Sequence, residues 1–187
     1  MEIKNLCKAF DDKIIFDNFS CVIPDGKVTF IIGSSGSGKT TLLRILAGLD
    51  DKFTGEIINI TNSKSIVFQE PRLFPYLSVA ENIKIVRNDD EPDELKEILK
   101  IVELTDDAFL LPSELSGGMK MRVSLARALY YNADLMLMDE PFSALDEELK
   151  NRMLPKIFAK LQGKTVIIIS HDMKDVDLYS DHIIDLN

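Results

Sequence analysis

The chain has 187 residues, of which 45% are hydrophobic and 28% charged. This length suits one domain with room for a small subdomain, and it lets a folded chain bury about 70% of the surface exposed on unfolding. The formal charge of -9 disfavours non-specific nucleic-acid binding, which needs a basic surface. Two cysteines, Cys7 and Cys21, are too few for a disulfide framework and suit a reducing compartment, where we interpret both as packing residues.

The first twelve residues lack the apolar core of a signal peptide. Apolar runs elsewhere stay far below the ~20 residues that span a bilayer. We therefore expect a soluble chain that can still dock on a membrane protein.

The N-terminal third predicts strands followed by a loop and a helix. Residues 1–6 and 14–23 mix β-branched and aromatic residues in partial alternation, which is typical of strands. After a Pro-Asp-Gly turn, residues 28–32 form a continuous apolar run that indicates a strand buried on both faces. A Gly/Ser loop then leads into a predicted helix over 40–47, with Gly48 as its C′ residue.

The middle of the chain is acidic. Ten acidic residues, Asp89 and Asp90 among them, lie between 88 and 114, and Lys96 and Lys100 alone oppose them. Apolar residues at helical spacing over 95–102 predict a helix, and a short strand is expected at 65–68. We interpret residues 70–114 as an acidic helical insert whose charges form a solvated face.

Alternating helices and strands follow. The predictions are a helix over 118–131, a buried strand over 135–138, a helix over 146–161 that Pro155 should kink or interrupt, a buried strand over 165–169, a short helix and a strand over 182–186. This alternation predicts a mostly parallel sheet with right-handed crossovers.

The loop between the strand at 28–32 and the next helix fits the phosphate-loop pattern G-x-x-x-x-G-K-[ST]. Glycines allow positive φ, and the backbone amides can then cradle phosphate oxygens at the helix N-terminus. In this pattern Lys39 bridges the β- and γ-phosphates and the Thr40 hydroxyl coordinates Mg²⁺. The predicted nucleotide-binding residues are Gly33, Ser34, Ser35, Gly36, Ser37, Gly38, Lys39, Thr40 and Thr41.

Two acids end the buried strand at 135–138. Ligands of parallel sheets bind at the carboxyl ends of the strands. Asp139 is the candidate for the Mg²⁺ shell, and Glu140 is the candidate general base for an attacking water.

A second glycine turn, Leu115-Ser116-Gly117-Gly118, begins the helix over 118–131. Ser116 is a natural N-cap, and the glycines expose amides to an anion. With the phosphate loop and the acid pair in this order, nearly the whole chain resembles the nucleotide-binding subunits of ABC transporters.

The resemblance implies roles for further residues. The Ser116, Gly117 and Gly118 turn would contact the γ-phosphate of ATP on the opposite subunit. Gln69 would sense Mg²⁺ and water, Asp146 would belong to the D-loop at 143–146, His171 would contact the γ-phosphate and Phe10 would stack on adenine. The implied catalytic set is Glu140, His171, Gln69 and Lys39, and the implied metal set is Thr40, Gln69 and Asp139.

The same resemblance implies an α/β fold, a P-loop NTPase core with a mostly parallel sheet, an N-terminal antiparallel β-subdomain and an inserted α-helical subdomain. The core would take residues 1–69 and 132–187, and the helical subdomain residues 70–131. The stretch at 68–75 looks like importer ATPases, and Met119 in place of Gln is similar to the nitrate, sulfonate and taurine import group. Implied partners are ATP with Mg²⁺, a second ATPase subunit in a homodimer, a transmembrane permease and a separate substrate-binding protein. The chain itself would be cytoplasmic and peripheral on the cytoplasmic face of the cell membrane.

Some residues depart from the family pattern. Phe10 replaces the usual Tyr, and Met119 and Met121 replace common glutamines. Alternatives also stay open: an export subunit, a soluble non-transport ABC ATPase, a nucleotide-dependent regulatory module, or a P-loop kinase. A kinase would not need the second glycine turn, and intact Glu140 and His171 argue against a module that does not hydrolyse ATP.

Overall fold

The structure is a computed structural model of the chain that describes all residues except 12, 89 and 90. Asp89 and Asp90 of the predicted acidic run therefore lie outside the described residues. The chain forms two compact units. Unit 1 contains residues 1–64, 134–139 and 163–187, and unit 2 contains residues 65–133 and 140–162.

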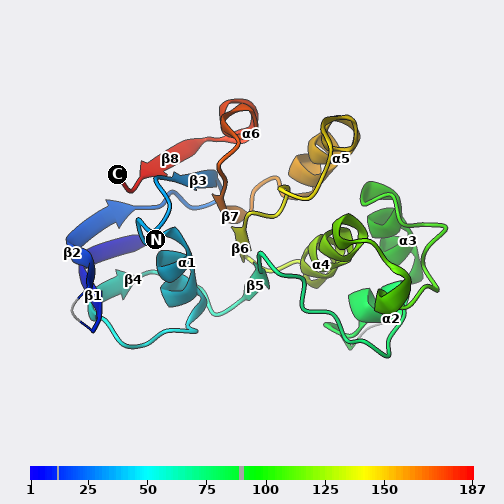
Figure 1. Ribbon diagram of the computed structural model, residues 1–187, viewed down its shortest axis with the longest axis horizontal. Helices are drawn as coiled ribbons and strands as arrows, with labels where there is room; N and C mark the ends of the chain where they lie inside the picture. The colour runs from blue at the N-terminus through cyan, green and yellow to red at the C-terminus, as the bar shows by residue number, and fades with distance from the viewer. Residues whose placement is uncertain (12, 89–90) are drawn as a thin grey trace. The chain divides into compact units, whose positions relative to one another are not determined.

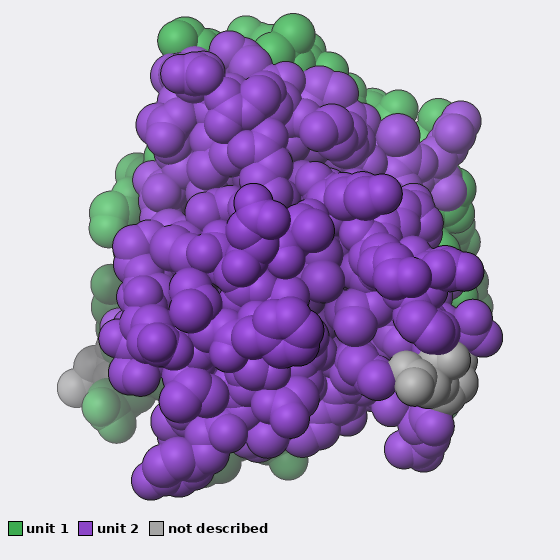
Figure 2. All heavy atoms as spheres, turned by 90° about the vertical axis from the view of Figure 1, so that its right-hand side faces the viewer, with its two compact units in different colours: residues 1–64, 134–139, 163–187 green, residues 65–133, 140–162 purple. Residues whose placement is uncertain are grey.

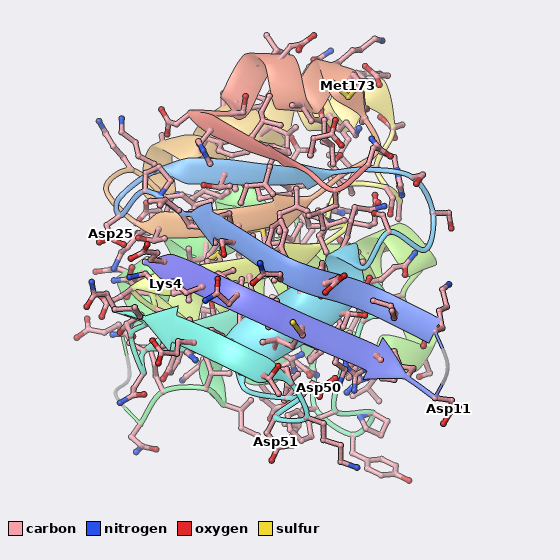
Figure 3. All side chains as sticks on the ribbon, turned by 90° about the vertical axis from the view of Figure 1, so that its left-hand side faces the viewer. Lys4, Asp11, Asp25, Asp50, Asp51 and Met173 are labelled. Atoms are coloured by element: carbon pink, nitrogen blue, oxygen red, sulfur yellow. The ribbon has the colours of Figure 1, made fainter. Side chains whose placement is uncertain are left out.

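Unit 1 holds an antiparallel sheet built from β1 (Glu2–Phe10), β2 (Lys13–Val22) and β4 (Thr54–Ile58) in the order β2-β1-β4. Figure 3 shows these three strands side by side, with β1 in the centre. The antiparallel β-subdomain predicted at the N-terminus is therefore present. The sequence pattern does not predict β4, because its residues are exposed or half-buried and show no alternation.

A parallel sheet is the second layer of unit 1. Its strands β6 (Leu135–Asp139), β7 (Thr165–Ile169), β3 (Val28–Ile32) and β8 (His182–Asp185) lie in the order β6-β7-β3-β8, each parallel to its neighbour. Phe30, Ile167 and Leu137 occupy neighbouring strands and are fully buried, as expected for apolar runs covered on both faces. The predicted parallel sheet is confirmed.

Two helices of unit 1 follow strands of this sheet. Helix α1 (Lys39–Ala47) comes after β3 and buries Leu42, Leu43 and Leu46, and it contacts β6 and β7. It ends at Gly48, whose φ of 75° is the left-handed C-cap that the sequence predicted. Helix α6 (Met173–Tyr179) follows β7 and begins at the N-cap Asp172 (Figure 1).

Unit 2 is mainly helical, and its surface is shown in purple in Figure 2. The chain enters it within β5 (Lys64–Val67). Helix α4 contacts both α2 and α3, and α3 also contacts α5. The helices are α2 (Val79–Lys84), α3 (Pro92–Ile101), a 3₁₀ turn η1 (Pro112–Glu114), α4 (Gly117–Tyr131) and α5 (Glu147–Lys160).

Helix α5 runs through Pro155 without interruption, so of the two effects predicted for this proline the interruption does not occur and the kink stays a prediction. A proline inside a helix removes one N–H donor, here the partner of the carbonyl four residues earlier. Both Asn151 and Pro155 are exposed, so water can satisfy that carbonyl. The proposed division of the chain at 69/70 and 131/132 stays a prediction.

Candidate functional site

The phosphate loop of unit 1 joins β3 to α1, and its backbone conformation depends on glycine. Gly33, Gly36 and Gly38 have φ values of 145°, 80° and 99°, which L side chains rarely adopt. A Cβ on Gly38 would also lie 2.7 Å from Cγ2 of Ile15 and 2.8 Å from Cζ of Phe16. These glycines therefore let the loop curl tightly against β2 and into the first turn of α1.

Lys39 lies inside this loop. Its side chain is buried, and Nζ donates hydrogen bonds of 2.8 Å to the carbonyl oxygens of Gly33 and Ser34. The hydroxyl of Ser37 is buried in the same loop without a hydrogen-bond partner among the described residues. The Lys39 ammonium is bound only by neutral carbonyl oxygens, and the Ser37 hydroxyl beside it has no acceptor among the described residues. A phosphate in this loop would give both groups an anionic hydrogen-bond acceptor.

The next residue, Thr40, reaches the acid at the end of β6. Its Oγ1 donates a 2.9 Å hydrogen bond to Oδ2 of Asp139. Burial raises the pKa of Asp139, and the Thr40 hydrogen bond and the charges of Lys39 and His171 offset this in part. Oδ1 of Asp139 is buried and has no hydrogen-bond partner among the described residues.

The Thr40–Asp139 pair fits Mg²⁺. Magnesium takes oxygen ligands, and it commonly uses one or two protein groups together with phosphate oxygens and water. The described residues contain no group of three or more His, Cys, Asp or Glu side chains that could hold a metal. A site made of one carboxylate, one hydroxyl and a nucleotide does not require such a group.

Two more predicted residues belong to unit 1. His171 is exposed and is the second residue after β7. It therefore lies at the carboxyl edge of the sheet, the edge at which Asp139 ends β6. Phe10 ends β1, is 49% exposed, and has the ammonium of Lys8 4.6 Å from its ring centroid. Phe10 therefore combines an accessible ring with a defined contact.

The second glycine turn lies in unit 2, at the start of α4. Ser116 caps the helix as predicted, because its Oγ accepts a 3.2 Å hydrogen bond from the N–H of Met119. Ser116 and Gly117 are exposed, and a Cβ added to Gly117 would meet nothing within 4 Å. At Gly118 a Cβ would lie 3.0 Å from the carbonyl oxygen of Ala144, so this glycine packs against the segment that follows Glu140.

Glu140 begins the second part of unit 2 with a φ of 50°. Left-handed backbone at a glutamate is uncommon and costs energy, and such residues cluster at functional sites. The carbonyl oxygen of Glu140 is held by Ser143, whose Oγ donates at 2.9 Å. Asp146 caps α5 by accepting from the N–H of Leu149 at 2.8 Å.

Gln69 is exposed and follows β5 after one residue. Unit 1 thus brings together Lys39, Thr40 and Asp139, and unit 2 brings Gly118 close to the loop between Glu140 and Asp146. Gln69, Glu140 and the Ser116 turn belong to a different unit from the phosphate loop.

Two buried polar residues with defined contacts, Lys8 and Asn82, are not predicted by the sequence patterns. Lys8 is 4% exposed, and its ammonium lies over the ring of Phe10. Asn82 is fully buried, and its side chain makes hydrogen bonds to Phe74, Leu77 and Ser78. A lysine at an inward position of a strand and an asparagine in an apolar helix pattern are the signals that could have identified them.

A strand followed by a glycine-rich phosphate loop with a buried lysine, and a hydroxyl–carboxylate pair that joins the start of α1 to the end of β6, define the class of P-loop nucleotide-binding proteins. Comparison with known proteins supports this class and identifies one family within it. The sequence profile described as "ABC transporter" matches residues 16–143. The chain belongs to the ABC transporter family.

Curated relatives are ATP-binding proteins of import systems. The chain is 38% identical to the aliphatic sulfonates import ATP-binding protein SsuB 1 of Paracoccus denitrificans, over 97% of this chain and 77% of that protein. It is 35% identical to the spermidine/putrescine import ATP-binding protein PotA of Pasteurella multocida, over 98% of this chain and 55% of that protein. The chain thus spans about three quarters of the sulfonate relatives and about half of PotA.

Solved structures agree in fold. The dimeric structure of MJ0796, a bacterial ABC transporter cassette, has a TM-score of 0.84 and 31% identity, covering 98% of this chain and 93% of that one. A post-hydrolysis state of the same cassette, bound to ADP and Pi, has a TM-score of 0.84 and 30% identity over 100% and 94% of the two chains. The α/β ATPase fold that the sequence predicted is confirmed.

The chain is therefore an ATPase, the ATP-binding subunit of an ABC transport system, and its relatives favour import over the alternatives of export, regulation or a soluble role. Within the part of the chain that the structure describes, no helix has the length and apolar character needed to cross a membrane.

Proposed function

We propose that two copies of this chain close around two ATP molecules and that this closure drives import through a separate permease. Each site takes the phosphate loop of one copy and the Ser116–Gly118 turn of the other. The observation that carries the proposal is the exposed, capped turn at the start of α4, which has free space above Gly117. Such a turn can approach a phosphate that a different chain holds.

The residues of unit 1 bind and orient ATP. Phe10 stacks on the adenine, the amides of Gly33–Thr41 hold the phosphates, and Lys39 leaves its carbonyl partners for the β- and γ-phosphate oxygens. Thr40, Asp139 and Gln69 would hold Mg²⁺, which when bound would supply positive charge against the negative charge that develops on the phosphate oxygens.

Glu140 is the general base. It accepts a proton from a water molecule whose oxygen attacks the γ-phosphorus, and the bond between that phosphorus and the β–γ bridging oxygen breaks to leave ADP and phosphate. His171 contacts the γ-phosphate, and the partner's Ser116 turn completes the anion site. Asp146, at the start of α5, helps to position the neighbouring copy.

For an import role, the ATPase would work at the cytoplasmic face of a membrane with a transmembrane permease, and a separate substrate-binding protein would serve the same transport system. The names of the relatives support this assignment. Those names also specify sulfonates, spermidine or putrescine, and Fe(3+) at 35–38% identity. Because ATPases for such different cargoes are almost equally similar to this chain, we assign the choice of cargo to the other subunits.

Light scattering of the Glu140→Gln variant with Mg²⁺ and ATP tests the composite site. We expect a monomer without nucleotide and a dimer with ATP, because the variant binds ATP without consuming it. Adding Ser116→Arg should abolish the dimer by filling the turn with a large side chain. Ser113→Arg, an exposed position three residues earlier, is the matched control and should leave the dimer intact.

Two results would count against the proposal. ATP that binds without forming a dimer at any protein concentration would rule out closure by this chain alone. A dimer that survives Ser116→Arg would show that the contact between copies lies elsewhere.

A further inference from the structure

Lys8 is a buried cation whose position is fixed by the loop that follows α1. The residue lies on β1 and is 4% exposed. Its Nζ donates hydrogen bonds of 2.7 Å to Oδ1 of Asp50 and 2.7 Å to the carbonyl oxygen of Lys52. The hydrogen bond from Lys8 also lowers the pKa of Asp50, so the carboxylate stays charged at neutral pH.

This arrangement is costly for a purely structural role. Removing two charges from water carries a desolvation penalty, and an apolar pair of similar volume is often as stable or more stable. A function that depends on the position of the ammonium would explain why a lysine lies here.

The neighbouring Phe10 supplies such a function. Its ring centroid lies 4.6 Å from Nζ of Lys8, within the range at which an ammonium is attracted to an aromatic face. Phe10 is the last residue of β1 and is 49% exposed, so its ring is not enclosed in a packed core. The fixed cation covers one side of the ring and limits its rotamers, and the rest of the ring stays accessible.

We propose that Lys8 is a positioning residue for the nucleotide base: it holds the Phe10 ring in the orientation that stacks on adenine. The inference rests on the proposed function, in which Phe10 is the stacking residue. The ammonium also draws π-electron density toward the covered face. This lowers the repulsion between the opposite face and the π-electrons of a stacked purine. Lys8 therefore acts on base binding and leaves phosphate binding unchanged.

Calorimetric titration with Mg-ADP and with Mg-pyrophosphate separates these two contributions, because pyrophosphate has no base and neither ligand is hydrolysed by the ATPase reaction. We expect Lys8→Met to weaken ADP binding about three- to tenfold and to change pyrophosphate binding less than about twofold. Lys8→Arg keeps the cation and should bind ADP nearly as the unmodified chain does. Lys4→Met, an exposed position on the same strand (Figure 3), is the matched control and should change neither affinity.

A double-mutant cycle with Phe10→Ala identifies the route of the effect. In the Phe10→Ala background, Lys8→Met should have no further effect on ADP binding, because the ring on which Lys8 acts is gone. Lys8→Gln keeps donor groups for Asp50 and Lys52, and it replaces Lys8→Met if that variant fails to fold.

The outcomes separate the two proposals. Equal weakening of ADP and pyrophosphate, or unchanged ADP binding in both neutral variants, would overturn the role of Lys8. Unchanged ADP binding in Phe10→Ala alone would instead overturn the stacking role of Phe10 on which the inference rests.

Discussion

Oγ1 of Thr40 and Oδ2 of Asp139 lie 2.9 Å apart, which joins the start of α1 to the end of β6 across 99 positions of sequence. Thr40 is exposed and Asp139 is buried. The second carboxylate oxygen, Oδ1, has no hydrogen-bond partner among the described residues, although it is out of contact with water. Burial of the charged Asp139 carboxylate with one unpaired oxygen is therefore unfavourable, and a bound cation would stabilise it.

Replacement of this carboxylate should stabilise the chain and inactivate it. Asp139→Asn keeps the shape of the side chain and an acceptor for Thr40 but removes the buried charge. We expect the free energy of unfolding without nucleotide to rise by about 1–3 kcal/mol at pH 7, as measured by urea titration. ATP hydrolysis should fall at least about 100-fold because the proposed Mg²⁺ site would lose its carboxylate. A variant that is less stable than the original chain would contradict this account.

The stability gain of Asp139→Asn should depend on pH. Burial raises the pKa of Asp139 above its ordinary value of 3.8, so the folded chain holds this proton to a higher pH than the unfolded chain does. Between these two pKa values the folded state binds more protons, and the stability of the original chain falls as pH rises. The advantage of the variant should be largest at neutral pH and shrink as pH falls toward 4. Urea titrations of both chains from pH 8 downward would measure this difference, and an advantage that grows in acid would contradict it.

Local patterns predicted the phosphate loop, the acid pair and the strands β3 and β7. These features depend on neighbouring residues: continuous apolar runs mark β3 and β7, and glycine spacing marks the loop. Strand β4 was missed because its pairing depends on distant residues. A Cβ on Gly55 would lie 2.5 Å from the carbonyl oxygen of Asn5, so glycine is needed for the approach of β4 to β1.

The supporting residues of the candidate site could not be predicted for the same reason. Lys8 meets Asp50 across 42 positions, and no short motif connects them. The backbone conformation of Glu140 could not be predicted either, since nothing in the pattern Asp-Glu-Pro specifies a φ of 50°. Sequence patterns predict which groups contact ATP, whereas the tertiary fold determines the residues that hold these groups in place.

The two glycines of the α4 turn should respond differently to alanine. A Cβ on Gly117 meets nothing within 4 Å, so Gly117→Ala should leave the unfolding midpoint within about 2 °C of the original value. The same change should weaken the ATP-dependent dimer of the Glu140→Gln variant, because in the proposed dimer the methyl group would lie where the phosphate held by the partner approaches the backbone. Thermal unfolding and light scattering measure the two effects, and Ser113→Ala serves as the control. An undiminished dimer would show that the backbone at Gly117 does not face the nucleotide.

Gly118→Ala should in addition disturb the loop after Glu140. Its Cβ would lie 3.0 Å from the carbonyl oxygen of Ala144, so that backbone must shift by a few tenths of an ångström. We expect a lower unfolding midpoint than for Gly117→Ala, together with a weaker dimer. Comparison of the two single variants by calorimetry tests this order. An equal or higher midpoint for Gly118→Ala would show that the loop adapts without cost.

Asn82 should be the most sensitive polar position of unit 2. Its Nδ2 donates to the carbonyl oxygens of Phe74, Leu77 and Ser78 at 3.1, 2.8 and 3.1 Å, and its Oδ1 accepts from the N–H of Phe74 at 2.9 Å. Asn82 is fully buried, so removing the amide leaves several of these groups unsatisfied. Asn82→Ala should lower the free energy of unfolding by about 2–4 kcal/mol.

Asn82→Asp distinguishes loss of hydrogen bonds from loss of volume. Aspartate has almost the same size and still accepts from Phe74, but its charged form has no N–H to donate to the three carbonyl groups. It should therefore destabilise the chain at least as much as alanine does at neutral pH. Lys96→Ala, an exposed position on α3, is the control and should change stability little. If Asn82→Asp proves nearly as stable as the original chain, the three donated hydrogen bonds contribute little, and the segment over 74–78 is held by its apolar contacts.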